Sequence, residues 1–212
     1  MKKRSNILEI KPLGTSGKSN ERFDIFVAGS IENGKAIEWQ KHFKKELEKM
    51  RPKHAVGLFN PRRDNWDPTW GGADDEANPE LIKQIEWELD HLEQADLIVM
   101  FLQPGTISPI SLLELGLFAK EVYRAEKQMI VLCPGGFHRK TNVDVVCQYY
   151  DISIAKNMDD LIKRTKERIK DHFAPKDKKL KLYKSTRETN PKKCAKMGGV
   201  CDCSLAEMGK YC

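Results

Sequence analysis

An acidic residue stands inside an otherwise apolar stretch of this sequence. The stretch is PISLLELGLFA, Pro109–Ala119, and the acid is Glu114. If the stretch is helical, no side chain one turn away from Glu114 is a cation, so an ion pair on the helix surface does not account for it. Burial would raise the pKa of Glu114, whereas the helix N-terminus and the hydroxyl groups of Ser108 and Ser111 would lower it. Such a carboxylate can attack the anomeric carbon of a sugar, as in a retaining glycosidase.

This chemistry needs a second carboxyl group that gives or takes a proton. The segment PELIKQIEWELDHLEQ, residues 79–94, offers Glu86, Glu88 and Asp90. Their spacing alone does not choose among them, so the second group stays open at this point.

Two further polar segments follow apolar runs. The turn GSIENG, with Gly29 and Ser30, offers backbone N–H groups and a hydroxyl to a phosphate or a sugar. It matches neither G-x-G-x-x-G nor a P-loop, so we expect no cofactor. The loop NPRRDNWDPTW suits a planar ring, because Trp stacks on rings and Asp or Asn can bind their polar edges. Its candidates are Asp64, Asn65 and Trp66. A plain turn and a loop packed on the domain are the alternatives.

The composition fits one well-cored domain with an appendage. The chain has 212 residues, of which 40% are hydrophobic and 32% charged, and a net charge of +6. Its longest apolar run, LIVMFL (Leu97–Leu102), is far shorter than a membrane span. The basic start of the chain has no apolar core of signal-peptide length, so we expect a cytoplasmic protein without a membrane partner. Six cysteines over this length predict reduced thiols rather than a disulfide scaffold.

Apolar runs alternate with helical patterns along the middle of the chain. We expect strands at RFDIFVAGS, AVGLFNP, ADLIVMFL and QMIVLCP, a weaker one at YYDISIA, and helices at KAIEWQKHFKKELEKM, PELIKQIEWELDHLEQ, SPISLLELGLFAKEVYRAEK and MDDLIKRTKERIKDHF. Ser108 and Pro109 suit an N-cap and a first helical position. An apolar stripe marks the helix over 79–94: Ile82, Ile85, Leu89 and Leu92. The alternation predicts an α/β fold, with a parallel sheet covered on both faces and ligands at the carboxyl ends of its strands, beside Glu114.

This interpretation divides the chain into three parts. Residues 1–20 form a loose N-terminal leader, residues 21–173 the α/β domain, and residues 174–212 a basic, Cys-containing tail. The spacing of the tail cysteines, C-x6-C-x-C-x8-C, is not a usual zinc motif, so we favour a tail without metal over a zinc site. The zinc candidates are Cys194, Cys201, Cys203 and Cys212. Binding of nucleic acid by the basic tail is possible in principle, but a solvated charge run is the commoner explanation.

Four segments together resemble a known enzyme family. IFVAGSIENG, NPRRDNWDPTW, EWELDHLEQADLIVMF and SPISLLELGLFA, in this order and spacing, resemble the nucleoside 2-deoxyribosyltransferase family, which includes the 2′-deoxynucleoside 5′-monophosphate N-glycosidases. The resemblance covers residues 22–155 and implies a flavodoxin-like (Rossmann-like) subunit. It also implies a homo-oligomer whose active sites borrow groups from a neighbouring subunit. The small-molecule partners would be a deoxynucleoside or deoxynucleotide and a free nucleobase.

The resemblance also implies roles for single residues. Glu114 would be the nucleophile that forms a 2-deoxyribosyl-enzyme intermediate. Glu88 falls where the family has an acid that protonates or contacts the leaving base. Asn142 falls near the position that reaches into the neighbouring active site. The base-contacting loop of the family corresponds to Asp64, Asn65 and Trp66.

Two positions depart from the transferase pattern. Phe26 stands where transferases often have a Tyr that hydrogen-bonds the nucleophile. Ser108 stands where transferases often have an Asp for the sugar hydroxyls and the glycosidases have a Ser that meets a phosphate, and Ser30 resembles the glycosidase phosphate turn. The first hypothesis is therefore transfer of deoxyribose between bases. Hydrolysis of a deoxynucleoside 5′-monophosphate is the second, and a non-catalytic nucleotide-binding module is the third.

Overall fold

The structure, a computed structural model, describes residues 6–14, 19, 21–31, 36–63 and 78–175. The chain falls into two compact units, Met1–His172 and Phe173–Cys212, and all secondary structure given below belongs to the first. Several predictions concern residues outside the described ranges and stay predictions: those for Asp64, Asn65, Trp66, Cys194, Cys201, Cys203 and Cys212.

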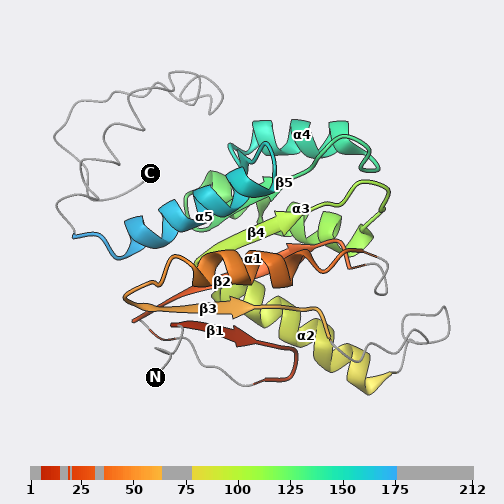
Figure 1. The fold of residues 1–212 in the computed structure, drawn as a ribbon. Helices are drawn as coiled ribbons and strands as arrows, with labels where there is room; N and C mark the ends of the chain where they lie inside the picture. The colour runs from red at the N-terminus through yellow and green to blue at the C-terminus, as the bar shows by residue number, and fades with distance from the viewer. Residues whose placement is uncertain (1–5, 15–18, 20, 32–35, 64–77, 176–212) are drawn as a thin grey trace, which may run out of the picture. The chain divides into compact units, whose positions relative to one another are not determined.

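The described strands form one parallel sheet of six strands in the order β1-β3-β2-β4-β5-β6 (Figure 1). Without the edge strand β1, the order of the other five is that of the flavodoxin-like folds. The strands are β1 (Ile7–Ile10), β2 (Arg22–Gly29), β3 (Ala55–Phe59), β4 (Leu97–Phe101), β5 (Gln128–Leu132) and β6 (Ser153–Ile154).

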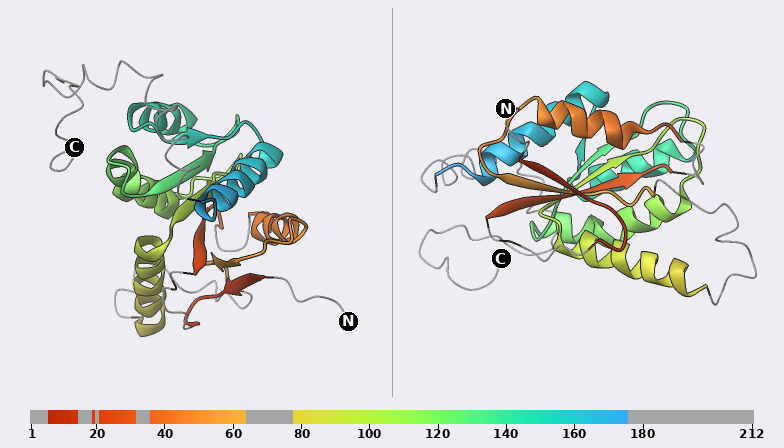
Figure 2. Two further views of the ribbon diagram at one scale, coloured as in Figure 1. Left: turned by 90° about the vertical axis from the view of Figure 1, so that its left-hand side faces the viewer. Right: turned by 60° about the horizontal axis from the view of Figure 1, so that its bottom comes forward.

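Helices cover both faces of this sheet. α1 and α5 lie on one face, and α2, α3 and α4 lie on the other (Figure 2). Their bounds are α1 (Trp39–Glu48), α2 (Pro79–Gln94), α3 (Pro109–Tyr123), α4 (Lys140–Tyr149) and α5 (Met158–His172). The predicted α/β class and the parallel sheet are therefore confirmed. No helix in the described part of the chain is both long and apolar enough to cross a membrane.

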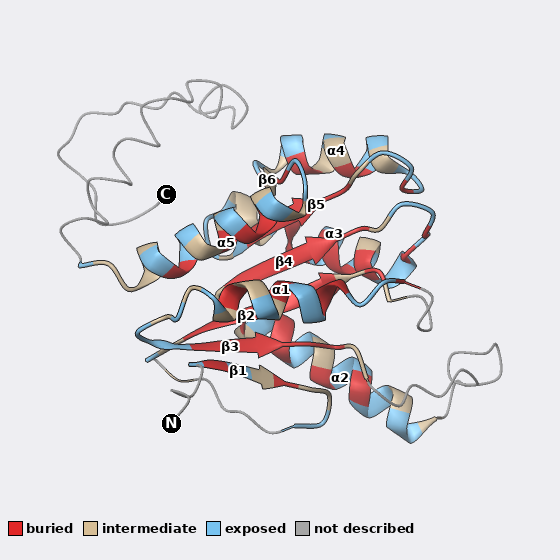
Figure 3. Cartoon of the chain, viewed as in Figure 1, coloured by how far each residue is buried: buried red, intermediate tan, exposed pale blue. Residues whose placement is uncertain are grey.

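The core lies between the sheet and its two helical layers (Figure 3). All five residues of β4, with the sequence LIVMF, are buried. A strand with helices on both sides has no solvent-facing side, and for this reason it is apolar throughout rather than at alternate positions.

The prediction of a loose N-terminal leader is wrong for part of its length. Residues 7–10 are not part of a loose leader but form β1, which pairs in parallel with β3. Glu9 fixes this strand from the side, since it accepts hydrogen bonds from Lys44 Nζ and Asn60 Nδ2, both at 2.7 Å. A four-residue edge strand is too short for its hydrophobic pattern to stand out among Lys, Ser and Gly.

The orientation of α2 corrects a second prediction. Its bounds are as predicted, and the side chain of Asn78 caps its first turn. Of the expected apolar stripe, however, only Leu92 is buried, whereas Ile82, Ile85 and Leu89 are more than 40% exposed. The buried residues of α2 are Gln84, Trp87, His91 and Leu92.

The structure adds one helix that the sequence did not predict. α4 has the sequence KTNVDVVCQY, whose three valines and one threonine favour strands over helices. Val143 and Cys147, four residues apart, are its buried positions and hold it on the sheet. Packing of these two residues thus outweighs a weak local preference.

Candidate active site

Three hydroxyl groups meet at the carboxyl ends of β2 and β4. Ser30 Oγ lies 2.8 Å from Thr106 Oγ1 and 2.6 Å from Ser108 Oγ, and the Thr106 and Ser108 oxygens are 3.0 Å apart. The backbone N–H of Gln103 donates to Ser30 Oγ at 2.9 Å. All three hydroxyl-bearing residues are buried. They form an uncharged polar cluster, which we call the hydroxyl cluster, at the sheet edge where ligands bind in such folds.

Backbone geometry brings the cluster together. Gly29 has a φ of +129°, and a Cβ added there would lie 2.1 Å from the carbonyl oxygen of Phe101. The next residue, Ser30, donates its N–H to that same oxygen at 2.9 Å. Glycine is therefore required at the point where the ends of β2 and β4 converge.

Ser108 and Pro109 occupy the N-cap and first helical positions of α3, as predicted. Ser108 has a left-handed φ of +47°, however, and its side chain makes no capping hydrogen bond to α3. Its hydroxyl is turned into the hydroxyl cluster instead. The strained backbone therefore points this side chain at the site rather than at the helix, as is common at functional positions.

Glu114 lies in the second turn of α3 and is only 7% exposed. It accepts no hydrogen bond within the part of the chain that the structure describes. Loss of solvation raises its pKa to about 8, and the negative charge of Glu88 contributes to this rise. The sequence predicted that burial would raise this pKa and that the helix N-terminus and nearby hydroxyls would lower it, and in the structure the effect of burial is the larger. The hydroxyls of Ser108 and Ser111 do not act as donors to this carboxyl group.

Glu88 is the second carboxyl group of the site. Glu86 and Asp90 are exposed, so Glu88 is the one acid of the three that faces inward. Burial raises the pKa of Glu88, while a hydrogen bond from Gln84 and the positive charge of Arg63 oppose the rise. The negative charge of Glu88 on α2 raises the pKa of Glu114 on α3, so the two acids lie near enough for one charge to act on the other group.

The structure also places two other residues discussed from the sequence, Asn142 and Phe26. Asn142 is exposed on the first turn of α4. Phe26 is fully buried, with its ring centroid 6.5 Å from that of Trp87, and offers Glu114 no donor.

Four residues that the structure places here had no role predicted from the sequence: Gln84, Arg63, Gln103 and Thr106. Two of them had a signal that could have been used. Gln84 precedes Glu88 by one helical turn and so shares its face of α2. Thr106 lies two residues before Ser108, in the short segment between the predicted strand ADLIVMFL and the predicted helix that begins at Ser108.

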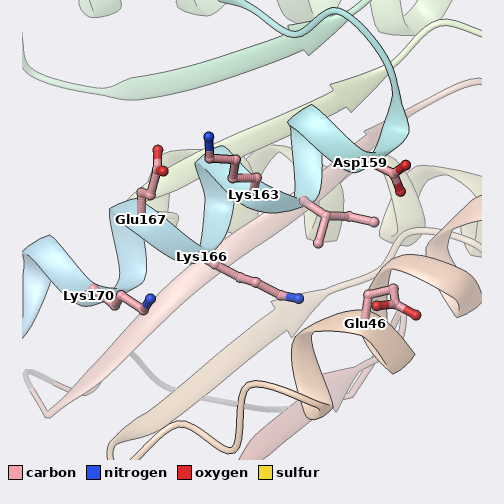
Figure 4. Close-up of a pocket in the computed structure, with 7 residues that line it drawn as sticks. Glu46, Asp159, Lys163, Lys166, Glu167 and Lys170 are labelled. Atoms are coloured by element: carbon pink, nitrogen blue, oxygen red, sulfur yellow. The ribbon is translucent and has the colours of Figure 1, made fainter.

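A groove between α1 and α5 lies away from these groups (Figure 4). Besides Ile162, its lining consists of three carboxylates and three ammonium groups: Glu46, Asp159, Glu167, Lys163, Lys166 and Lys170. These charges balance, so the groove has no excess of either sign with which to attract an ionic ligand.

Comparison with known proteins decides the family. The family model described as nucleoside 2-deoxyribosyltransferase like matches residues 22–137, which is more than half of the chain. The chain belongs to this family. The resemblance predicted from the sequence is thus confirmed. The nucleoside 2-deoxyribosyltransferase-like family is of glycosyltransferase or N-glycosidase type and binds nucleosides or nucleotides.

The matched range holds both acids and the hydroxyl cluster, whereas β1, α4, β6 and α5 lie outside it. No curated protein matches the chain. Among solved structures, a conserved protein from Enterococcus faecalis V583 is similar at 14% identity and a TM-score of 0.46. That similarity covers 69% of this chain and 98% of the other.

Proposed function

We propose that this protein cleaves the N-glycosidic bond of 2′-deoxynucleosides and transfers the deoxyribosyl group to another base. The observation that supports this most directly is the pair of carboxyl groups on neighbouring helices, the buried Glu114 and the half-buried Glu88, whose charge acts on Glu114. Two carboxyl groups in unlike surroundings are what a retaining glycosyl transfer requires.

The proposed reaction has two steps. The Glu114 carboxylate attacks C1′, the bond between C1′ and the base nitrogen breaks, and the electron pair stays with the base, which takes a proton from Glu88. A 2-deoxyribosyl ester of Glu114 remains. In the second step a nitrogen of the incoming base attacks C1′ and releases Glu114, and the proton of that nitrogen passes to Glu88.

A panel of deoxynucleosides, each offered with and without a second free base, tests this proposal by chromatography. We expect a new nucleoside that appears only when the second base is present. Glu114→Gln keeps the shape of the side chain but cannot form the ester, so it should lose the activity by at least about a thousandfold. Glu86→Gln, an exposed acid on α2, is the matched control and should retain it. If Glu114→Gln turns over like the wild type, the proposal is wrong.

Hydrolysis of 2′-deoxynucleoside 5′-monophosphates is a second candidate, favoured by the hydroxyl cluster. Ser30, Thr106 and Ser108 carry no charge that would repel a phosphate, and hydroxyls can donate to its oxygens. The same panel, run with the 5′-monophosphates, separates the two reactions. Release of free base and deoxyribose 5-phosphate, whether or not a second base is present, would identify the hydrolase. Ser108→Asp should then abolish hydrolysis of the monophosphate by charge repulsion.

We also propose that the protein works as a homo-oligomer. Two neighbouring helices on the same side of the sheet expose large apolar side chains, which we call the α2–α3 apolar face: Ile82, Ile85 and Leu89 on α2, and Ile110, Leu113 and Leu117 on α3. Exposed apolar side chains gathered in this way mark interaction surfaces. A second copy on this face would lie beside both acids, from where its Asn142 could contribute to the site.

A further inference from the structure

Gln84 makes a specific contact with the second acid of the site. It lies one helical turn before Glu88 on the inner side of α2 and is only 5% exposed. Its Nε2 donates a hydrogen bond to Glu88 Oε1 at 2.8 Å. An ionised carboxylate can only accept hydrogen bonds, so the amide must turn its nitrogen, not its oxygen, towards Glu88.

The other half of the same amide has no partner. Gln84 Oε1 is buried and accepts no hydrogen bond from any described residue. A buried acceptor without a donor destabilises the folded state, and a methionine of similar length would avoid that cost. Fold stability therefore does not explain a glutamine at this position, whereas donation to Glu88 does.

We infer that Gln84 is a positioning residue for Glu88, which holds one carboxyl oxygen so that the other carries the proton given to the leaving base. Because Oε1 already accepts the hydrogen bond from Gln84, a proton on Glu88 is directed to Oε2. A general acid acts only when its proton points at the atom it serves, so fixing the orientation of this side chain is worth a large factor in rate. The inference rests on the proposed glycosyl transfer.

The first test compares substrates that differ in their need for a proton. For purines the pair is 2′-deoxyguanosine and 7-methyl-2′-deoxyguanosine, whose base leaves without protonation, and for pyrimidines it is 2′-deoxyuridine and 5-fluoro-2′-deoxyuridine, whose base leaves more readily. Relative to wild type, we expect Gln84→Met to lose about 10- to 100-fold in kcat/KM on the demanding substrate and only about threefold on the activated one. Equal losses on both substrates would overturn the inference.

The second test needs no turnover. The hydrogen bond from Gln84 lowers the pKa of Glu88, so its stabilising effect is present when Glu88 is ionised and is lost as the pH falls. The deficit in free energy of unfolding of Gln84→Met against wild type should therefore grow from pH 4 to pH 8. A residue that merely fills space would give a difference independent of pH. If Gln84→Met does not fold, Gln84→Leu replaces it, since this variant also lacks the donor and adds no titratable group.

Gln40→Met is the matched control. Gln40 is a buried glutamine on α1, on the opposite side of the sheet, and neither polar atom of its side chain has a partner among the described residues. Its replacement should change stability equally at both pH values and leave the ratio of the two substrates unchanged. An inactive wild-type protein would refute the proposed transfer, while the unfolding measurements would still decide whether Gln84 and Glu88 are coupled.

Discussion

Glu114 and Glu88 differ in their surroundings, although they are the same residue type. Glu114 has no donor within the described residues, and its pKa rises to about 8 through burial and the charge of Glu88. For Glu88, a hydrogen bond from Gln84 and the charge of Arg63 oppose the rise in pKa that burial causes. In the free chain at neutral pH the raised pKa of Glu114 therefore favours its protonated form. Attack on a sugar needs Glu114 ionised, so binding of substrate must favour loss of that proton from Glu114.

The raised pKa of Glu114 predicts how stability depends on pH. Below pH 4.5 the carboxyl is neutral in both folded and unfolded chains. Between that value and about 8 only the unfolded chain ionises, so the free energy of unfolding falls as the pH rises. Glu114→Gln removes this loss, and the variant should gain on wild type by at most about 4 kcal/mol between pH 5 and pH 8. Urea unfolding at the two pH values measures this, and parallel behaviour of the two proteins would contradict it.

The sequence indicated which residues belong to the candidate site, but it did not indicate which hydrogen bonds they make. Glu114, Ser30 and Ser108 could be placed together because the carboxyl ends of parallel strands share one edge of the sheet. Whether Ser108 donates to Glu114 or joins Ser30 depends on one backbone angle, the φ of +47° at Ser108. That backbone angle cannot be derived from the residue types alone.

Helix α2 carries Glu88 and is held at its C-terminal end by a lysine. Lys127 Nζ donates to the carbonyl oxygens of Leu92, Glu93 and Ala95 at 3.0, 2.6 and 3.1 Å. These include carbonyl groups that the end of a helix leaves without intrahelical partners, and a cation there also opposes the negative end of the helix dipole. This one side chain therefore ties the end of α2 to the segment that leads into β5.

We expect Lys127→Met to lower the free energy of unfolding by about 1 to 2 kcal/mol, because the methionine keeps the apolar stem and removes the donors. Lys163→Met, at an exposed position inside α5 and away from its C-terminal end, is the control and should change the free energy by no more than about 0.5 kcal/mol. Urea denaturation of both variants beside wild type checks the expectation. Equal effects of the two substitutions would show that the three carbonyl contacts contribute nothing.

The sequence predicted long elements well and short ones poorly. The bounds of α2 were expected correctly, because a Pro after an Asn and sixteen residues of helical pattern mark it clearly. β1 escaped prediction because its four residues become a strand only by pairing with β3, far away in the chain. The apolar stripe predicted on α2 has helical spacing but faces outward rather than towards the core. The inner side of α2 holds Gln84 and His91, and the outer side holds isoleucine.

The outward-facing apolar stripe of α2 affects the molecule as a whole. A single chain leaves Ile85 and Leu89 in water on α2, together with Leu113 and Leu117 on α3, while the polar Gln84 and His91 are buried. Apolar side chains outside and polar ones inside are unfavourable for an isolated subunit. They are expected of a surface that another subunit covers beside an active site.

We therefore expect the wild-type protein to sediment as a dimer or larger assembly. Leu117→Lys should shift it towards monomers, because an ammonium group within an apolar interface has no partner and is costly to desolvate. Leu8→Lys changes a similarly exposed leucine on the distant edge strand β1 and should leave the assembly unchanged. If a subunit completes its neighbour's site, the Leu117→Lys monomer should also lose activity although its own Glu114 and Glu88 are intact. A wild-type protein that is monomeric and active at all concentrations would contradict both the interface and the shared site.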